Sequence, residues 1–130
     1  MPFFSKTSKE RLATCHPDLQ KVANRAIQLI DFTVVCGHRR QAEQDAAFYN
    51  GKSTKKWPFS THNRIPSLAM DLAPYPIDWE DTDRFIYLAG IIIGIGFEYG
   101  IPIRWGGDWD SDFITQDEKF RDYPHFELNY

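Results

Sequence analysis

One apolar stretch limits most strongly what this chain can fold into. Residues 86–97 read IYLAGIIIGIGF, a run of 12 residues interrupted by glycines. A helix that spans a bilayer needs about 20 apolar residues, so this run is too short to cross a membrane. We therefore predict a buried core helix from about Thr82 to Tyr99, with Gly100 as its C-terminal cap.

The other segments predict three more helices and four short strands. Thr7 and Glu10 have the spacing of a capping box, which opens the first helix. Pro17 suits the first position of the second helix, whose apolar residues recur at helical spacing through Ile30. The third helix is expected over residues 41–50, the strands over 32–36, 68–73, 101–105 and 125–128, and long irregular segments over 52–67 and 106–124.

These elements favour an α+β fold, with a small antiparallel sheet flanked by helices. The chain has 130 residues, of which 42% are hydrophobic, and this is enough for the core of one domain over residues 1–130. The net charge is -3 and the basic residues are scattered, so we expect neither nucleic acid nor a membrane as a partner. Cys15 and Cys36 are expected to be free, buried thiols rather than a disulfide.

An aspartate interrupts one of the predicted strands. In the segment STHNRIPSLAMDLAP, residues 60–74, side chains should alternate between the two faces of an extended chain. Asp71 then points away from the apolar face and has only small alanines, Ala69 and Ala73, beside it on its own face. An ordinary, half-exposed strand aspartate is the alternative interpretation, and Asp71 alone does not decide between the two.

Two histidines extend this observation. His62 precedes the strand that carries Asp71, and His125 begins the last predicted strand. Two imidazoles and one carboxylate are a typical set of zinc ligands, and three protein ligands leave a fourth position open, as in catalytic sites. Residues of these types also occur together by chance in chains of this size.

The segment RDYPHFEL adds a candidate general base. Asp122 lies three residues before His125, with a proline in the turn between them. Its carboxylate can therefore approach a water molecule at the metal without binding the metal itself. The alternative is that Asp122 is one more surface acid in an acidic segment.

Several motifs together resemble a known family. HPDLQKV, DFTVVCGHRRQAEQ, YNGKS, STHNRIPSLAMDLAPYPIDW, WGGDW and DYPHFEL follow one another along nearly the whole chain. In this order they resemble the zinc peptidases of peptidoglycan stem peptides: the D-alanyl-D-alanine carboxypeptidases and, more closely, the phage L-alanyl-D-glutamate endopeptidases that act as endolysins. The resemblance implies a zinc peptidase fold of the Hedgehog/DD-peptidase type.

The resemblance also implies roles for individual residues. His62, Asp71 and His125 would hold Zn²⁺, Asp122 would be the general base, and Arg39 would contact the substrate or the oxyanion. Arg40 is a rival for the last role, and His38 is expected to pack or to form a wall of the cleft. The nine-residue step from His62 to Asp71 and the use of Asp as the base both favour the endopeptidase branch.

The implied function is hydrolysis of the L-Ala–D-Glu amide bond in the stem peptide during host cell lysis. The enzyme would be a monomer that stays in the host cytoplasm, because its N-terminus lacks the apolar region of a secretory signal, until a holin-type helper releases it. The alternatives are a D-alanyl-D-alanine carboxypeptidase and a non-catalytic, zinc-stabilised wall-binding module.

A second acidic motif does not favour a metal site. DWDSD, residues 108–112, has the acid spacing that opens an EF-hand loop. Phe113 replaces the required glycine, and Lys119 stands where the closing glutamate belongs, so calcium is not expected there.

Overall fold

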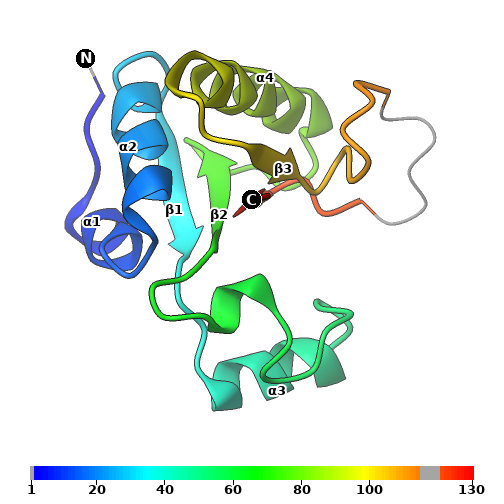
Figure 1. Cartoon of the computed structure of the whole chain (residues 1–130). Coiled ribbons are helices and arrows are strands. Elements are labelled where there is room, and N and C mark those ends of the chain that lie inside the picture. Colours follow the sequence, from blue (N-terminus) through cyan, green and yellow to red (C-terminus); the bar gives the residue numbers. More distant parts are fainter. Residues whose placement is uncertain (1, 115–120) are drawn as a thin grey trace.

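The computed structural model describes residues 2–114 and 121–130 (Figure 1). Lys119, which stands where an EF-hand loop has its closing glutamate, lies outside these residues. The elements in chain order are α1 (Lys6–Leu12), α2 (Pro17–Ala26), β1 (Phe32–Cys36), α3 (Gln41–Tyr49), the 3-10 turn η1 (Thr61–Asn63), β2 (Ala69–Pro74), α4 (Thr82–Tyr99), β3 (Ile103–Trp105) and β4 (His125–Leu128).

The strands form one antiparallel sheet in the order β1-β2-β4-β3, which confirms the predicted α+β class. Helix α1 packs on β1, and α4 packs on α2, β2 and β3. Helix α3 lies apart from the other helices, beyond the end of the sheet where β1 stops and β2 starts (Figure 1). Because the chain enters and leaves α3 at that end, polar residues from β1, η1 and β2 meet there.

Helix α4 is a core helix on one face only. Leu88, Ile92 and Ile95 are buried against the sheet and α2, whereas Tyr87 and Phe97 are 69% and 72% exposed. Each fully buried apolar side chain of this size contributes about 1.5–3 kcal/mol to folding. The expectation that the whole apolar run is buried was therefore wrong for its outer face. No helix in the described part of the chain is long and apolar enough to cross a bilayer.

Two helix ends differ from the predictions. Helix α1 begins at Lys6, because the hydroxyl of Ser5 rather than that of Thr7 accepts the capping bond from the backbone N–H of Ser8. Helix α2 ends at Ala26 instead of Ile30, since the backbone tightens there into i→i−3 bonds. The start of α2 is capped by the His16 ring, whose Nδ1 accepts from Asp18 N–H at 3.0 Å.

The two cysteines are free, as predicted, but they lie in different surroundings. Cys15 is buried, and this burial raises the pKa of its thiol to about 12. Cys36 is only half-buried at the end of β1, so the expectation of two buried thiols is wrong for this residue.

Candidate active site

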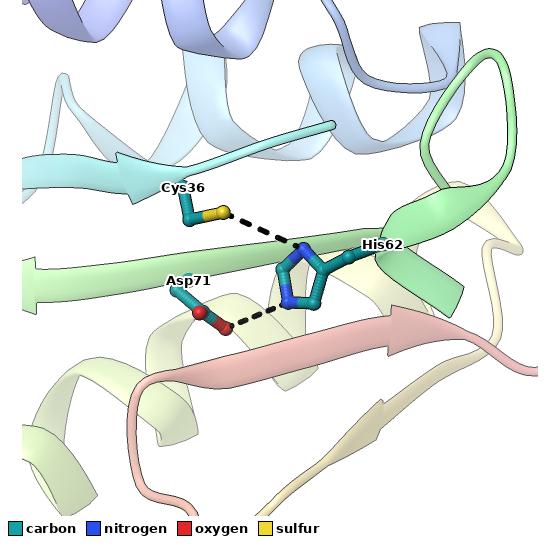
Figure 2. A group of neighbouring side chains, drawn as sticks. All are labelled: Cys36, His62 and Asp71. Carbon is teal, nitrogen blue, oxygen red and sulfur yellow. Dashed lines mark hydrogen bonds and ion pairs between the residues drawn. The ribbon is translucent and has the colours of Figure 1, made fainter. Parts of the chain in front are cut away.

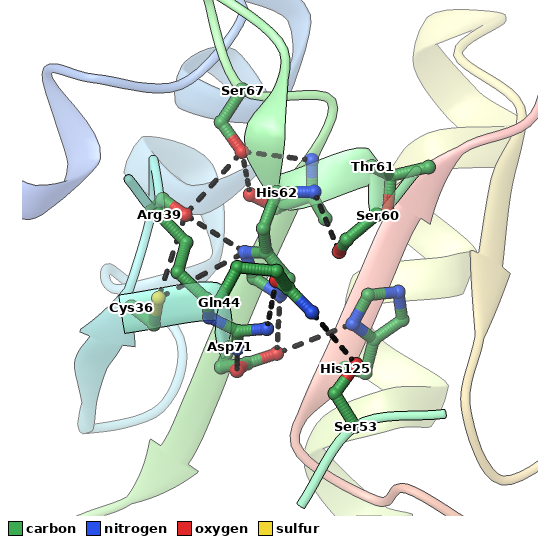
Figure 3. A network of polar contacts seen from close by, with 12 residues as sticks. Cys36, Arg39, Gln44, Ser53, Ser60, Thr61, His62, Ser67, Asp71 and His125 are labelled. Carbon is green, nitrogen blue, oxygen red and sulfur yellow. Dashed lines mark hydrogen bonds and ion pairs between the residues drawn. The ribbon is translucent and has the colours of Figure 1, made fainter. Parts of the chain in front are cut away.

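Three elements bring His62, Asp71 and His125 together. Strand pairing places His125 of β4 directly opposite Asp71 of β2, and η1 lies against β2 and supplies His62. His62 Nε2 lies 3.1 Å and His125 Nδ1 lies 3.3 Å from the same oxygen, Asp71 Oδ1. The centroids of the two imidazole rings are 5.1 Å apart, and both rings lie beside Asp71 (Figure 3). His62 and His125 lie 9 positions before and 54 positions after Asp71 in the sequence, and one nitrogen of each ring converges on its carboxylate oxygen.

The other nitrogen of each ring has its own acceptor. His62 Nδ1 lies 2.8 Å from the carbonyl oxygen of Gly37, and His125 Nε2 lies 2.7 Å from Glu127 Oε1. An N–H directed to such an oxygen leaves the opposite nitrogen free to bind a metal, and metal-binding histidines almost always have this arrangement. The geometry thus presents Nε2 of His62 and Nδ1 of His125 toward Asp71.

Cys36 is a further potential ligand that the sequence did not indicate. The ligand atoms of Cys36, His62 and Asp71 all lie within 4.8 Å of one another (Figure 2). The thiol, however, faces His62 Nδ1 at 3.9 Å, and this nitrogen is the one directed at Gly37. The set of His62, Asp71 and His125 therefore uses free ring nitrogens, whereas Cys36 lies on the occupied side of the His62 ring.

Of the two neighbouring arginines, Arg39 is the one that faces the cluster. Its Nη2 lies 3.5 Å from Asp71 Oδ2, and its backbone N–H donates to the carbonyl of His62 at 2.8 Å. Arg40 is exposed at the N-terminal end of α3, where its backbone N–H donates to Glu43. His38, beside them, is half-buried, and its backbone N–H donates to Thr14.

Gln44 connects the segments around the site and was not identified from the sequence. It is the buried residue of α3, and its Oε1 accepts from Arg39 Nη1 at 2.9 Å and from Asn63 Nδ2 at 3.2 Å. Its Nε2 donates to Ser53 Oγ and to the carbonyl oxygen of Lys55. Gln44 thereby ties the irregular segment after α3 to Arg39 and η1 (Figure 3).

Asp122 is held next to the cluster by its backbone. Its N–H donates to Gly106 O at 2.8 Å, and its carbonyl accepts from His125 N–H at 3.0 Å. A Cβ at position 106 would lie 2.1 Å from the Asp122 carbonyl oxygen, so this approach requires glycine. Burial raises the pKa of the Asp122 carboxyl, and the negative charge of Asp71 raises it further, against the opposing effect of His125.

The charges of the cluster depend on one another. Burial alone would lower the pKa of His62, but the Asp71 carboxylate outweighs it and raises this pKa to about 10. The pKa of His125 is also raised: burial opposes the shift, and the bonds to Asp71 and Glu127 outweigh it. Burial in turn opposes ionisation of Asp71, but the two histidines hold its pKa well below the usual range. The charges of His62, His125 and Asp71 therefore stabilise one another.

The acidic motif at residues 108–112 forms a second group of potential ligands. The carboxylates of Asp108, Asp110 and Asp112 lie within 4.8 Å of one another. Asp108 Oδ2 accepts from the backbone N–H of Phe113 at 2.8 Å. Phe113 has φ 66°, so it adopts the left-handed backbone of the glycine that it replaces. Backbone amides of the loop itself thus bind these carboxylates.

The chain is similar to known peptidases along nearly its whole length. The family model described as phage L-alanyl-D-glutamate peptidase matches residues 1–129. The chain is 41% identical over 133 residues to the L-alanyl-D-glutamate peptidase of Escherichia phage T5, with 96% of each protein covered. The crystal structure of the Serratia marcescens L-Ala D-Glu endopeptidase ChiX is similar, with a TM-score of 0.78 and 30% identity over 99% of this chain and 90% of that one.

Proposed function

Because the chain belongs to the phage L-alanyl-D-glutamate peptidase family, we propose that it is a zinc-dependent endolysin, with residues 1–130 as one catalytic domain. It hydrolyses the amide bond between L-Ala and D-Glu in the stem peptide of peptidoglycan. His62, Asp71 and His125 bind the zinc ion, Asp122 is the general base, and Arg39 binds the substrate.

The observation that carries this proposal is the convergence of His62 Nε2 and His125 Nδ1 on Asp71 Oδ1. Nitrogen and carboxylate oxygen are ligands that zinc prefers, and three of them leave one position for a reactant. The bonds from the opposite ring nitrogens to Gly37 and Glu127 fit the same role, since they fix which nitrogen of each ring is available.

Zinc at such a site supplies a Lewis acid that polarises a carbonyl and lowers the pKa of water to about 7. Burial raises the pKa of the Asp122 carboxyl, and this shift suits a residue that takes up a proton during the reaction. Asp122 accepts a proton from the attacking water and then gives it to the amine of D-Glu as the C–N bond breaks. Proton transfer of this kind contributes about 10²- to 10⁴-fold to the rate.

Arg39 provides a planar group of N–H donors beside the cluster. Gln44 accepts from its Nη1, and Asp71 lies near its Nη2, so the guanidinium is held in one orientation. A guanidinium in this position can donate to the carbonyl oxygen that gains negative charge, or to a carboxylate of the stem peptide.

We further propose that the enzyme acts as a monomer and reaches the cell wall from the host cytoplasm through a holin-type helper. The relatives act on L-alanyl-D-glutamate bonds, as their names state. Lysis in the presence of the enzyme and a holin, but not with the enzyme alone, would support this route.

Asp122→Asn tests the catalytic role, because it removes the base and retains the size of the side chain. We expect the variant to bind one zinc ion like the wild type and to lose about 10²- to 10⁴-fold in kcat on a defined stem peptide. Glu98→Gln, an exposed acid of α4, is the matched control and should retain full turnover. Near-full cleavage by Asp122→Asn would show that another group is the base, whereas zinc binding with no cleavage by the wild type would favour a wall-binding module.

A further inference from the structure

Glu127 is a buried carboxylate that none of the proposed catalytic steps uses. It lies two residues after His125 in β4, so both side chains point to the same face of the strand. Its Oε1 is 2.7 Å from His125 Nε2. This is the nitrogen of His125 that faces away from Asp71.

The second oxygen of Glu127 is fixed from the neighbouring strand. Arg104 of β3 lies opposite Glu127 in the register of the sheet, and its Nη2 donates to Glu127 Oε2 at 2.7 Å. The hydroxyl of Thr61, next to His62 in η1, lies 3.4 Å from Glu127 Oε1. Both oxygens of the Glu127 carboxylate therefore have hydrogen-bond partners in addition to His125.

Trp109 completes the surroundings of this group. Its ring centroid is 5.4 Å from that of His125, and the Arg104 guanidinium lies 5.5 Å from the Trp109 ring. His125, Glu127, Arg104 and Trp109 thus form a closed set of contacts. An imidazole held in this way has little freedom to turn about its own axis.

We propose that Glu127, held by Arg104, is a positioning residue that makes His125 bind the metal through Nδ1. It accepts the Nε2–H of His125, so that Nδ1, on the side of Asp71, is the nitrogen available to the metal. This inference rests on the proposed zinc site. A charged acceptor also makes the imidazole a stronger ligand than a neutral one does, and the near acceptor of His62 Nδ1 is the neutral Gly37 carbonyl. The two histidines are therefore unequal, and His125 depends on a second charged side chain.

Glu127→Gln tests this role, because it keeps the shape of the side chain and removes the charge. Loss of such a partner typically weakens metal binding by about 10- to 100-fold, and we expect this in a competition titration of zinc against a chromogenic chelator. In NMR spectra of the zinc-loaded protein, the Nε2 proton of His125 should give a downfield, slowly exchanging signal in the wild type. The variant should show this signal shifted upfield and exchanging faster, because a neutral amide oxygen is a weaker acceptor than a carboxylate. Glu98→Gln should change neither measurement.

Variants of Arg104 keep the test valid if Glu127→Gln does not fold. Arg104→Lys retains a cation beside Glu127 and should keep zinc affinity close to that of the wild type, whereas Arg104→Met should lower it in the same direction as Glu127→Gln. A purely structural role would lower the melting temperature and leave the zinc affinity and the Nε2 signal unchanged, which would overturn the inference. A wild-type protein that binds no zinc would overturn the proposed function instead.

Discussion

Asp71→Asn is the substitution whose effect follows most directly from the structure. The Asp71 carboxylate lies 3.1 Å from His62, 3.3 Å from His125 and 3.5 Å from Arg39. At such distances each pair attracts with about 5 kcal/mol for an effective dielectric constant near 20, before the cost of burial is subtracted. Asparagine keeps the shape of the side chain and removes the charge that holds His62 protonated.

The loss of stability should depend on pH. The pKa of His62 is raised to about 10, above the ordinary value of 6.5. The Asp71–His62 pair therefore stabilises the metal-free wild type fully below pH 6.5, and this contribution is lost as the pH rises through about 10. Removing one partner of a buried ion pair costs about 3–5 kcal/mol, so we expect this difference at pH 6. At pH 10 the difference should shrink to below about 2 kcal/mol.

Urea unfolding of the chelator-treated proteins at pH 6 and pH 10 measures both values. Glu98→Gln controls for the loss of one negative charge and should stay within about 0.5 kcal/mol of the wild type. An Asp71→Asn effect of equal size at the two pH values would refute the reasoning, because it would show that Asp71 acts through packing rather than through the charge of His62.

Three further predictions concern the metal and the neighbouring segments. Zinc binding at pH 7 should release protons, since a pKa of about 10 keeps His62 protonated before the metal binds. Calorimetry in two buffers that differ in ionisation enthalpy measures this release, and zero release would contradict the prediction. Gly106→Ala should lower kcat by about 10²-fold, because the added Cβ displaces Asp122. Gly94→Ala, where a Cβ meets nothing within 4 Å, should retain activity. Equal activity of the two variants would show that the close contact between Gly106 and Asp122 does not matter for catalysis. Arg39→Lys should lower kcat/KM through loss of the paired donors, and Arg40→Lys should not; the opposite order would assign the role to Arg40.

The sequence predicted the regular elements well where the residue pattern itself determines them. The strands at 32–36 and 125–128 have the predicted bounds. The first is rich in β-branched residues, and the second alternates polar and apolar side chains. The end of α2 was predicted four residues late. Apolar residues continue at helical spacing through Ile30, but this spacing does not reveal that the backbone changes to tighter, i→i−3 hydrogen-bonded turns after Ala26.

The sequence predicted the residues of the candidate site but not the neighbouring side chains that hold them in place. Motif order selected His62, Asp71 and His125, which the structure brings together, although their roles stay predictions. Glu127 was not predicted as a residue of the site. Its bond to Arg104 depends on the pairing of β3 with β4, which no local pattern specifies.

Cys36 and Gln44 escaped prediction for related reasons. Cys36 lies opposite Asp71 only because the register between β1 and β2 shifts at an irregularity after Val34. Gln44 looks like any polar residue of a short surface helix, and its burial follows from the segment that folds back onto α3. Contacts of this kind arise from tertiary packing, so spacing along the chain does not reveal them.

Mass spectrometry of purified muropeptides tests the central claim most directly. The muropeptides are incubated with the protein, with and without a chelator, and with zinc restored after chelation. If hydrolysis of the L-Ala–D-Glu bond depends on zinc, the protein should release a peptide that begins with D-Glu. This product should be absent with the chelator and should form again when zinc is restored. Release of terminal D-Ala alone would contradict the account and indicate a carboxypeptidase, and cleavage that persists in the chelator would show that the reaction does not need the metal.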